Sequence, residues 1–323
     1  MADRVERVAV IGLGTMGHGI AQSFAAAGCH VVGYDDMAAA AASAKARIAR
    51  NLRQFADAGL VDDADAAATL DRVSIVDTVA EAVANADFVI EAVREDLPTK
   101  IALLAEIEPI VSDATIIASN SSTFPISQSG ERLRRPERAL VAHWFNPPHI
   151  VPTVEVVPSP ATSETTIERT IELLARSGKV PVRLNLELPG FLVNRVQIAL
   201  FREVWDLLRR GVASPDQIDA AIRGSMGFRL AALGPLQVQD FGGLDVQTTV
   251  YRNLVPEIAS GTAIPLEVQR LVDTGDLGVK SGRGFFDYAG EGAGRAVADR
   301  DRKFLALLAA LRSAERGGST GSP

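Results

Sequence analysis

The sequence predicts a doubly wound α/β fold with a mostly parallel sheet, followed by an all-α C-terminal domain. Short apolar runs alternate with helical segments through the first half of the chain, a pattern typical of βαβ units. A glycine-rich turn joins the first apolar run to the first helical segment. From about residue 190 onward, helical periodicity continues without evident strands. These observations separate the chain into an α/β half and a helical half.

The first two strands are expected at 7–11 and 30–35, with a helix over 16–27 between them. Because parallel strands need a crossover connection, these segments predict one βαβ unit. Residues 38–70 are rich in alanine and are expected to form a helical pair inserted before the next strand. The remaining strands are expected at 73–76, 88–91, 115–118, 140–143, 153–157 and 180–182, with helices such as 97–111 and 165–177 between them.

The chain changes character near Leu188-Pro189-Gly190, a sequence that favours a break between elements. A long, largely apolar helix is expected over 191–210, and Ser214 begins another helix with a capping signal. We therefore expect an α/β domain over 1–186 and a helical domain over 187–315. The last residues, 316–323, are rich in glycine and serine and are expected to form a flexible tail.

The composition is that of a globular protein with an acidic balance. Of 323 residues, 33 are Lys or Arg and 40 are Asp or Glu, so the formal net charge is −7. This balance argues against nucleic acid or an anionic membrane as a partner. The one cysteine, Cys29, cannot form an intrachain disulfide, and no apolar run approaches the roughly 18 residues of a membrane helix. We expect a cytoplasmic protein, with the arginine-rich segment 132–138 as a solvated turn.

The glycine-rich turn, Gly12-Leu13-Gly14-Thr15-Met16-Gly17, fits the G-x-G-x-x-G pattern of a dinucleotide-binding, Rossmann-type domain. Gly12 permits a tight turn, Gly14 lets the backbone approach a pyrophosphate, and Gly17 lets helix and strand pack closely. The N–H groups at the start of the following helix attract phosphate. We therefore expect Thr15 and Met16 to belong to the cofactor site as well.

Asp35 stands at the end of the second expected strand. A carboxylate at this position accepts hydrogen bonds from the adenosine ribose hydroxyls of a dinucleotide. The additional phosphate of NADP would meet the carboxylates of Asp35 and Asp36, with no adjacent arginine to neutralise it. The sequence therefore predicts NAD rather than NADP as the cofactor.

His143 and Glu155 form a candidate acid–base pair. His143 ends a late strand, and Glu155 lies twelve positions later on the next strand. Ligands of such sheets bind at the carboxyl ends of the strands. A neighbouring carboxylate would orient the imidazole and stabilise its protonated form, as a general base that removes a hydroxyl proton requires. From these residues alone, a purely structural histidine remains an alternative.

Motifs along nearly the whole chain resemble those of the L-3-hydroxyacyl-CoA dehydrogenase family, in the same order and with the same spacing. The matching residues are Gly12-x-Gly14-x-x-Gly17, Glu91-x-x-x-Glu95-x-x-x-x-Lys100, Ser119-Asn120-Ser121-Ser122, His143-x-Phe145-Asn146-Pro147, Glu155, Pro189-Gly190-Phe191-x-Val193-Asn194-Arg195, Gly234-Pro235, Asp240, Gly243-Leu244-Asp245 and Lys280-Ser281-Gly282-x-Gly284-Phe285.

The resemblance implies an NAD-dependent dehydrogenase that oxidises a secondary alcohol, in a 3-hydroxy acid or a 3-hydroxyacyl-CoA, by hydride transfer to NAD. It implies that His143 is the general base and that Glu155 is its partner. Ser122 would hydrogen-bond the substrate oxygen, and Asn194 would hold the substrate. A homodimer through the helical domain is also implied, and no metal is expected. The residues implied to line the nicotinamide side of the cofactor pocket are Glu95, Lys100 and Asn120.

The substrate remains open between two classes. Pro148, after Asn146-Pro147, resembles the branch that contains lambda-crystallin (L-gulonate 3-dehydrogenase), carnitine dehydrogenases and a pyridine-carboxylate dehydrogenase, which act on small polar substrates without CoA. Arg229 fits this branch and could pair with a substrate carboxylate, with a surface charge as the alternative. Binding of CoA phosphates is equally conceivable through basic residues of the inserted helix, namely Lys45, Arg47, Arg50 and Arg53.

Two further functions are alternatives. Dehydrogenases of the 3-hydroxyisobutyrate and 6-phosphogluconate type share the glycine-rich opening, but they use a lysine on the long helix. This chain has no lysine between Lys179 and Lys280. A non-catalytic NAD-binding structural protein is the second alternative, although such a protein has no need of the four candidate catalytic residues.

Overall fold

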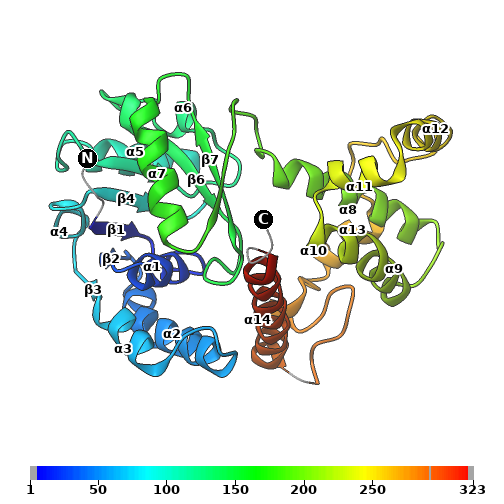
Figure 1. The fold of residues 1–323 in the computed structure, drawn as a ribbon, viewed down its shortest axis with the longest axis horizontal. Helices are drawn as coiled ribbons and strands as arrows, with labels where there is room; N and C mark the ends of the chain where they lie inside the picture. Colours follow the sequence, from blue (N-terminus) through cyan, green and yellow to red (C-terminus); the bar gives the residue numbers. More distant parts are fainter. Residues whose placement is uncertain (1–5, 291, 319–323) are drawn as a thin grey trace. The chain divides into compact units, whose positions relative to one another are not determined.

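The structure is a computed structural model that describes residues 6–290 and 292–318 (Figure 1). Its internal contacts divide the chain into two compact units. Unit 1 extends to Asn194 and also contains Phe304–Ala310, whereas unit 2 contains Arg195–Lys303 and resumes at Leu311.

Unit 1 is built on a single eight-stranded sheet with the order β3-β2-β1-β4-β5-β6-β7-β8. Neighbouring strands pair in parallel, except that β6 and β7 pair antiparallel. The strand order extends from β1 in both directions, so the sheet is doubly wound and the predicted α/β class is confirmed. The strands are β1 (Arg7–Ile11), β2 (His30–Tyr34), β3 (Val73–Ile75), β4 (Phe88–Glu91), β5 (Ile116–Ser119), β6 (Ala139–Trp144), β7 (Thr153–Pro158) and β8 (Val180–Arg183).

Helices flank this sheet (Figure 1). They are α1 (Gly17–Ala26), α2 (Ala38–Asp57), α3 (Asp63–Asp71), α4 (Val79–Val83), α5 (Leu97–Ile107), α6 (Ile126–Ser129), the 3-10 turn η1 (Pro136–Arg138) and α7 (Glu164–Arg176). Side chains alternate along each strand, so β1 sends Val8 and Val10 into one core cluster and Ala9 and Ile11 into another. Residues of α1, α2 and α7 complete the first cluster, and residues of α4, α5 and α6 complete the second.

The helical pair expected over 38–70 is present as α2 and α3, between β2 and β3. Helix α2 buries Ala44, Ile48 and Leu52, which share one face at helical spacing. Helix α3 begins after Asp62, whose side chain accepts the backbone N–H of Asp65 and so caps the helix. The inserted pair therefore packs on unit 1 through a narrow apolar stripe.

The expectation of a solvated arginine turn over 132–138 is wrong for Arg138. This side chain is buried, at 5% exposure. Its guanidinium donates to the backbone carbonyl of Ser112 and, at 3.3 Å, to that of Glu108. Arg138 thus donates to two carbonyl oxygens near the end of α5 that lack a partner within the helix. The number of arginines in this segment does not indicate such a contact.

Unit 2 is helical. Its described part contains two isolated β-bridges, Gly278–Arg283 and Arg283–Asp287, but no strand, which confirms the predicted all-helical character. The first helix, α8 (Val193–Arg209), has its first two residues in unit 1 and the rest in unit 2. The others are α9 (Pro215–Ile222), the π-helical turn η2 (Arg223–Gly227), α10 (Phe228–Ala232), α11 (Pro235–Gly242), α12 (Leu244–Leu254), α13 (Leu266–Asp273), the 3-10 turn η3 (Val279–Ser281) and α14 (Gly292–Gly318).

Helix α14 differs from the expected division of the chain in two respects. Its segment Phe304–Ala310 belongs to unit 1, because Leu305 and Leu308 bury their side chains against Ile150. The helix also continues to Gly318, inside the segment 316–323 that we expected to be a tail. Residues 319–323 lie outside the described residues. None of the helices in 6–290 and 292–318 combines the length and apolarity needed to cross a bilayer.

Candidate active site

The glycine-rich turn connects β1 to α1 at the carboxyl end of the sheet. Gly12 has φ of +92°, and a side chain there would place its Cβ 2.7 Å from the carbonyl oxygen of Ala92. A Cβ at Gly17 would lie 1.7 Å from the carbonyl oxygen of Gly12. Gly14 has no atom within 4 Å of its Cβ position, so its surface is open. Two glycines therefore close the turn, and the middle one leaves room for a ligand.

Backbone donors line this open surface. No acceptor is recorded, among the residues that the structure describes, for the N–H groups of Gly14, Thr15 and Met16. The positive end of the α1 dipole starts at the same place. Free N–H groups at a helix N-terminus attract the pyrophosphate of a dinucleotide, so this turn fits NAD.

Asp35 follows β2 and faces the same turn. Its Oδ2 accepts the backbone N–H of Leu13 at 2.6 Å, and its Oδ1 accepts that of Met37 at 2.8 Å. Each carboxylate oxygen has a second lone pair, which leaves acceptor capacity for ribose hydroxyls. Asp35 therefore both fixes the turn and stands where the sequence places the ribose contact.

His143 and Glu155 are directly opposite each other on the antiparallel strands β6 and β7. Nδ1 of His143 lies 2.7 Å from Oε2 of Glu155, and both side chains are buried, at 3% and 0% exposure. Since the carboxylate accepts, Nδ1 carries the proton in this contact and Nε2 of the neutral ring has a lone pair. The structure thus brings together the two residues of the predicted acid–base pair.

The second oxygen of Glu155 is also occupied. Oε1 accepts the backbone N–H groups of Leu192 and Val193, at 3.1 and 2.8 Å. These groups belong to the start of α8, where helix N–H groups lack partners within the helix. Charged acceptors form strong hydrogen bonds with such donors, so the buried carboxylate is satisfied on both oxygens.

Two phenylalanine rings flank the imidazole of His143. The ring centroids of Phe145 and Phe191 lie 4.5 and 5.4 Å from that of His143. Phe191 is the one non-glycine residue of the described chain with a positive φ, at 51°. A bulky side chain in this left-handed region costs about 1–3 kcal/mol, so its packing against the core and the imidazole must offset that strain.

Ser122 and Asn194 also come together. The side-chain amide of Asn194 donates to the backbone carbonyl of Ser122 at 3.3 Å. This contact joins the loop after β5 to the first turn of α8. The Ser122 side chain is left for another partner, and both residues are only partly buried. The geometry thus groups two of the predicted substrate-binding residues.

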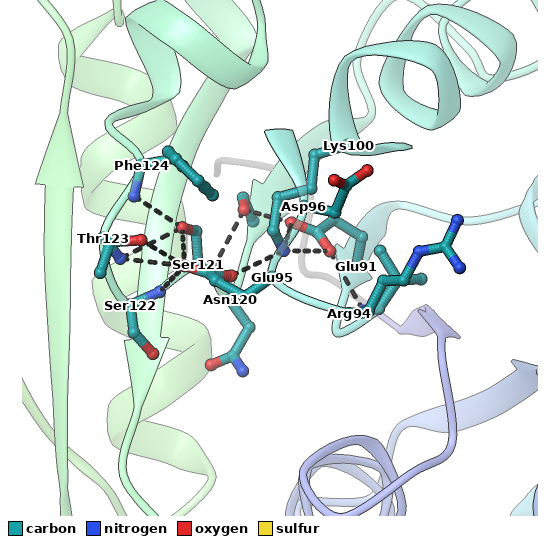
Figure 2. Close-up of polar contacts among 12 residues, drawn as sticks. Glu91, Arg94, Glu95, Asp96, Lys100, Asn120, Ser121, Ser122, Thr123 and Phe124 are labelled. Carbon is teal, nitrogen blue, oxygen red and sulfur yellow. Dashed lines mark hydrogen bonds and ion pairs between the residues drawn. The ribbon is translucent and has the colours of Figure 1, made fainter. Parts of the chain in front are cut away.

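Glu95 organises the loop that carries Ser122 (Figure 2). Its Oε1 accepts the Ser121 hydroxyl at 2.6 Å, the N–H of Ser122 at 2.9 Å, and the N–H and hydroxyl of Thr123 at 3.0 and 2.8 Å. Burial alone would raise the pKa of Glu95. The hydrogen bonds from this loop and the charge of Lys100 outweigh burial and hold the pKa below its usual value. Glu95 is therefore an anion that shapes the serine loop.

Lys100 occupies a supporting position. Its ammonium lies 2.9 and 3.0 Å from the two oxygens of Glu91 and 3.2 Å from Oε2 of Glu95. The side chain is 1% exposed, so it offers no surface to a cofactor. This differs from the expectation that Lys100 lines the nicotinamide side of the pocket, because two carboxylates already surround its charge (Figure 2).

Glu91 was not among the predicted site residues. Its carboxylate is fully buried, accepts Lys100 and also accepts the hydroxyl of Ser119 on the neighbouring strand β5. The sequence held a signal for it, because Glu91 is a charged residue at the end of an otherwise apolar strand and belongs to the Glu91–Glu95–Lys100 motif.

Asn120 and Arg229 are the two remaining residues of the predicted site. Asn120 is 8% exposed, and its Oδ1 accepts the backbone N–H of Trp144 at 2.9 Å, which ties the ends of β5 and β6 together. Arg229 lies in unit 2, is exposed, and donates to the Ser225 carbonyl at 3.3 Å.

The basic residues of α2 do not form one uniform stripe. Lys45, Arg50 and Arg53 are exposed, whereas Arg47 turns toward the glycine-rich turn and donates to backbone carbonyls there. A phosphate-binding stripe on this helix would thus lack one of its four expected members. Among the described residues, no three His, Cys, Asp or Glu side chains form a group that could hold a metal ion.

Sequence comparisons assign both halves of the chain. Residues 7–187 match the domain described as "3-hydroxyacyl-CoA dehydrogenase, NAD binding domain", and residues 190–288 match "3-hydroxyacyl-CoA dehydrogenase, C-terminal domain". The first match covers the glycine-rich turn and the His143–Glu155 pair, and the second covers most of the helical part.

Similar proteins include members with and without CoA in their names. The chain is 34% identical over 313 residues to 5-formyl-3-hydroxy-2-methylpyridine 4-carboxylate 5-dehydrogenase of Mesorhizobium japonicum, which covers 96% of this chain and 100% of that protein. It is 35% identical over 285 residues to a probable 3-hydroxybutyryl-CoA dehydrogenase of Bacillus subtilis, which covers 88% of this chain and 98% of that one. A crystal structure of a 5-formyl-3-hydroxy-2-methylpyridine 4-carboxylic acid 5-dehydrogenase, described as an NAD+-dependent dismutase, aligns with a TM-score of 0.89 at 33% identity, over 95% of this chain and 99% of that chain.

Proposed function

We propose a function on the premise that this chain belongs to the 3-hydroxyacyl-CoA dehydrogenase family and is an NAD-dependent oxidoreductase. Its reaction is the oxidation of a secondary alcohol to a ketone in a small hydroxy acid, with His143 as the general base. The observation that carries this proposal is the buried contact of 2.7 Å between Nδ1 of His143 and Oε2 of Glu155. A purely structural NAD-binding protein has no use for an imidazole held in one tautomer.

In the mechanism, the Nε2 lone pair of His143 takes the hydroxyl proton of the substrate. Glu155 keeps the ring in the tautomer that can accept this proton, and its negative charge stabilises the imidazolium that results. When NAD is bound, its nicotinamide ring supplies the acceptor for the hydride that leaves the carbinol carbon. Phe145 and Phe191 shield the imidazole from water, which strengthens its interaction with Glu155.

The remaining residues hold the reactants. The hydroxyl of Ser122 donates to the substrate oxygen, and Asn194, which contacts the Ser122 backbone, holds the substrate beside it. The N–H groups of Gly14, Thr15 and Met16 bind the cofactor pyrophosphate, and Asp35 binds the ribose. Glu95 positions the Ser122 loop for this contact.

Between the two substrate classes, we favour a small polar hydroxy acid without CoA. The near-complete alignment with the pyridine-carboxylate dehydrogenase supports this choice, as does Pro148 after Asn146-Pro147. The orientation of Arg47 away from the exposed face of α2 also weakens the case for a CoA phosphate site. A 3-hydroxyacyl-CoA is the second candidate, because Lys45, Arg50 and Arg53 are exposed and the chain resembles a 3-hydroxybutyryl-CoA dehydrogenase.

A panel of substrates tests the proposal through NADH absorbance. Free 3-hydroxy acids, pyridine alcohols that carry a carboxylate, carnitine and 3-hydroxybutyryl-CoA are offered with NAD, and each assay is repeated with NADP. We expect turnover of a free 3-hydroxy acid, carnitine or a pyridine alcohol with NAD, and little turnover with NADP. Turnover with the thioester alone would favour the second candidate. NADH binding without turnover of any alcohol would contradict the proposed dehydrogenase activity.

We also propose a homodimer through the helical unit. Large apolar side chains are exposed on α10, α11 and α12, including Phe228 at 76% and Phe241 at 82%. Apolar surface of this extent favours burial against another copy of the chain. Native mass spectrometry should record twice the chain mass, and a monomer at micromolar concentration would contradict the dimer. A cytoplasmic location, without nucleic-acid or membrane partners, remains a prediction from composition.

A further inference from the structure

Arg47 reaches from α2 to the glycine-rich turn. Its Nη2 donates to the carbonyl of Leu13 at 2.7 Å and to that of Ala40 at 2.9 Å, and its Nη1 donates to the carbonyl of Gly14 at 2.9 Å. One guanidinium thus holds two successive carbonyls of the turn and anchors them to the first turn of its own helix.

The contacts of Arg47 determine which way the free donors of the turn face. In a trans peptide, the N–H points away from the C=O of the same unit. The carbonyls of Leu13 and Gly14 face Arg47, so the N–H groups of Gly14 and Thr15 face the opposite side. These are two of the N–H groups for which the described residues supply no acceptor. Arg47 therefore orients donors that it does not touch.

Asp35 completes this arrangement from another direction. Its Oδ2 accepts the N–H of Leu13 at 2.6 Å, while Arg47 holds the carbonyl of the same residue. Both polar groups of Leu13 are therefore fixed before a ligand arrives. Rigidity of this kind lowers the entropy lost on binding and so favours affinity.

Most of the terminal donors of the guanidinium are already occupied, so Arg47 is not built to bind a ligand phosphate directly. Three of its four terminal N–H bonds are used by carbonyls, and Nη1 also lies 3.1 Å from Nδ1 of His18. Burial lowers the pKa of His18, the contact with the Gly14 carbonyl raises it, and the charges of Arg47 and Arg50 lower it further. The resulting shift is downward, so the imidazole beside Arg47 is neutral at neutral pH.

We propose that Arg47 is a positioning residue for the cofactor: it presets the glycine-rich turn so that the N–H groups of Gly14 and Thr15 face the pyrophosphate of NAD. Arg47 acts through the backbone of the turn and touches neither the cofactor nor the substrate. The inference rests on NAD binding by this chain and not on the choice of substrate.

The test measures the Kd of NADH by fluorescence titration of the whole protein. Arg47→Met removes the donors, and Arg50→Met is the matched control, because Arg50 is exposed on the same helix and makes no recorded contact with the turn. Loss of several charge-assisted hydrogen bonds should raise the Kd of Arg47→Met about tenfold or more. The Kd of Arg50→Met should stay within about twofold of the parent value, because an exposed charge contributes little.

Kinetics separate positioning from a loss of folded protein. Arg47→Met should raise the KM for NAD, while kcat at saturating NAD and the KM for the alcohol stay close to the parent values. A destabilised protein would instead show a lower apparent kcat with an unchanged NADH Kd. Arg47→Lys keeps the charge but lacks the planar fork that reaches three carbonyls, so its Kd should fall between those of the parent and Arg47→Met.

An NADH Kd for Arg47→Met within about twofold of the parent value would overturn the inference, as would an equal weakening in Arg50→Met. If Arg47→Met does not fold, the comparison rests on Arg47→Lys, and an unchanged Kd in that variant overturns the inference. If the parent protein does not bind NADH, the cofactor assignment fails, and the proposed role of Arg47, which rests on it, fails with it.

Discussion

Glu155 supports His143 with one carboxylate oxygen and the start of helix α8 with the other. Oε2 lies 2.7 Å from Nδ1 of the imidazole, and Oε1 accepts the N–H of Val193 at 2.8 Å. The residue that orients the imidazole is thus also the one that satisfies the first N–H groups of a long helix. A change at Glu155 should therefore affect both turnover and stability, whereas a change at His143 should affect turnover most.

His143→Gln should lower kcat by about 10²–10⁴-fold, because glutamine cannot take the hydroxyl proton. The Kd of NADH should hardly change, since the glycine-rich turn follows β1 and does not contact His143. Steady-state kinetics and fluorescence titration measure the two effects. His30→Gln is the matched control, because His30 is exposed at the start of β2. Near-normal turnover in His143→Gln would remove this residue from the mechanism.

Glu155→Gln should lower kcat by about 10²-fold. It should also lower the free energy of unfolding by about 1–3 kcal/mol, because the α8 N–H groups lose a charged acceptor and the imidazole can keep a partner only by switching its tautomer. The carbonyl oxygen of glutamine can satisfy the imidazole or the α8 N–H groups, but not both. Urea denaturation and kinetics check the two effects. Glu164→Gln, which weakens an exposed ion pair with Arg183, should change neither property appreciably. A variant Glu155→Gln of unchanged stability would contradict the supporting role of Oε1.

Lys100→Met should lower the free energy of unfolding by about 3–5 kcal/mol, because it leaves the buried Glu91 carboxylate without its counter-charge. The double variant Glu91→Gln/Lys100→Met removes both charges and should recover most of this loss. Chemical denaturation of the parent, the single variant and the double variant measures the coupling. If the double variant is no more stable than Lys100→Met, the contribution of Lys100 to the free energy of unfolding does not come from its contact with Glu91.

Glu95 should make the protein's stability depend on pH. The pKa of Glu95 in the folded protein lies below its usual value of 4.5. The contribution of the Glu95 charge to the free energy of unfolding is therefore fully present above pH 4.5. It is lost as the pH falls through the folded-state pKa. The unfolding midpoint of the parent should therefore exceed that of Glu95→Gln above pH 4.5 and approach it below. Urea titrations on both sides of this pH provide the measurement. A constant difference at all pH values would mean that the charge of Glu95 plays no part.

The strands and the glycine-rich turn could be predicted from the sequence because each depends on local pattern, and the contact between His143 and Glu155 could be predicted from their positions on consecutive strands. Short continuous apolar runs specify buried strands such as β1 and β4, and the order of turn, helix and Asp35 specifies a dinucleotide site. Residues twelve apart on consecutive strands come together when those strands pair, as His143 and Glu155 do. The antiparallel direction of β7 was not predicted, because the connection after β6 carries no signal for it that we identified.

Contacts between distant segments could not be predicted in this way. Arg47 and Arg138 both resemble surface charges in the sequence, yet each donates to carbonyls more than 25 positions away. The motif spacing favours a cofactor-pocket position for Lys100, but in the structure its ammonium forms an ion pair with the buried carboxylate of Glu91. Such contacts depend on how helices and strands pack against one another. The hydrophobic pattern of the sequence does not indicate which backbone carbonyl will lack a donor in the folded protein.

The backbone conformation of Phe191 limits how freely this scaffold can be redesigned. Its φ of 51° excludes β-branched replacements on steric grounds, whereas glycine would suit the backbone but remove the ring beside His143. An engineer who reshapes this protein for a new alcohol therefore gains little by randomising position 191. Productive libraries should keep this phenylalanine and vary the residues that surround the bound molecule instead.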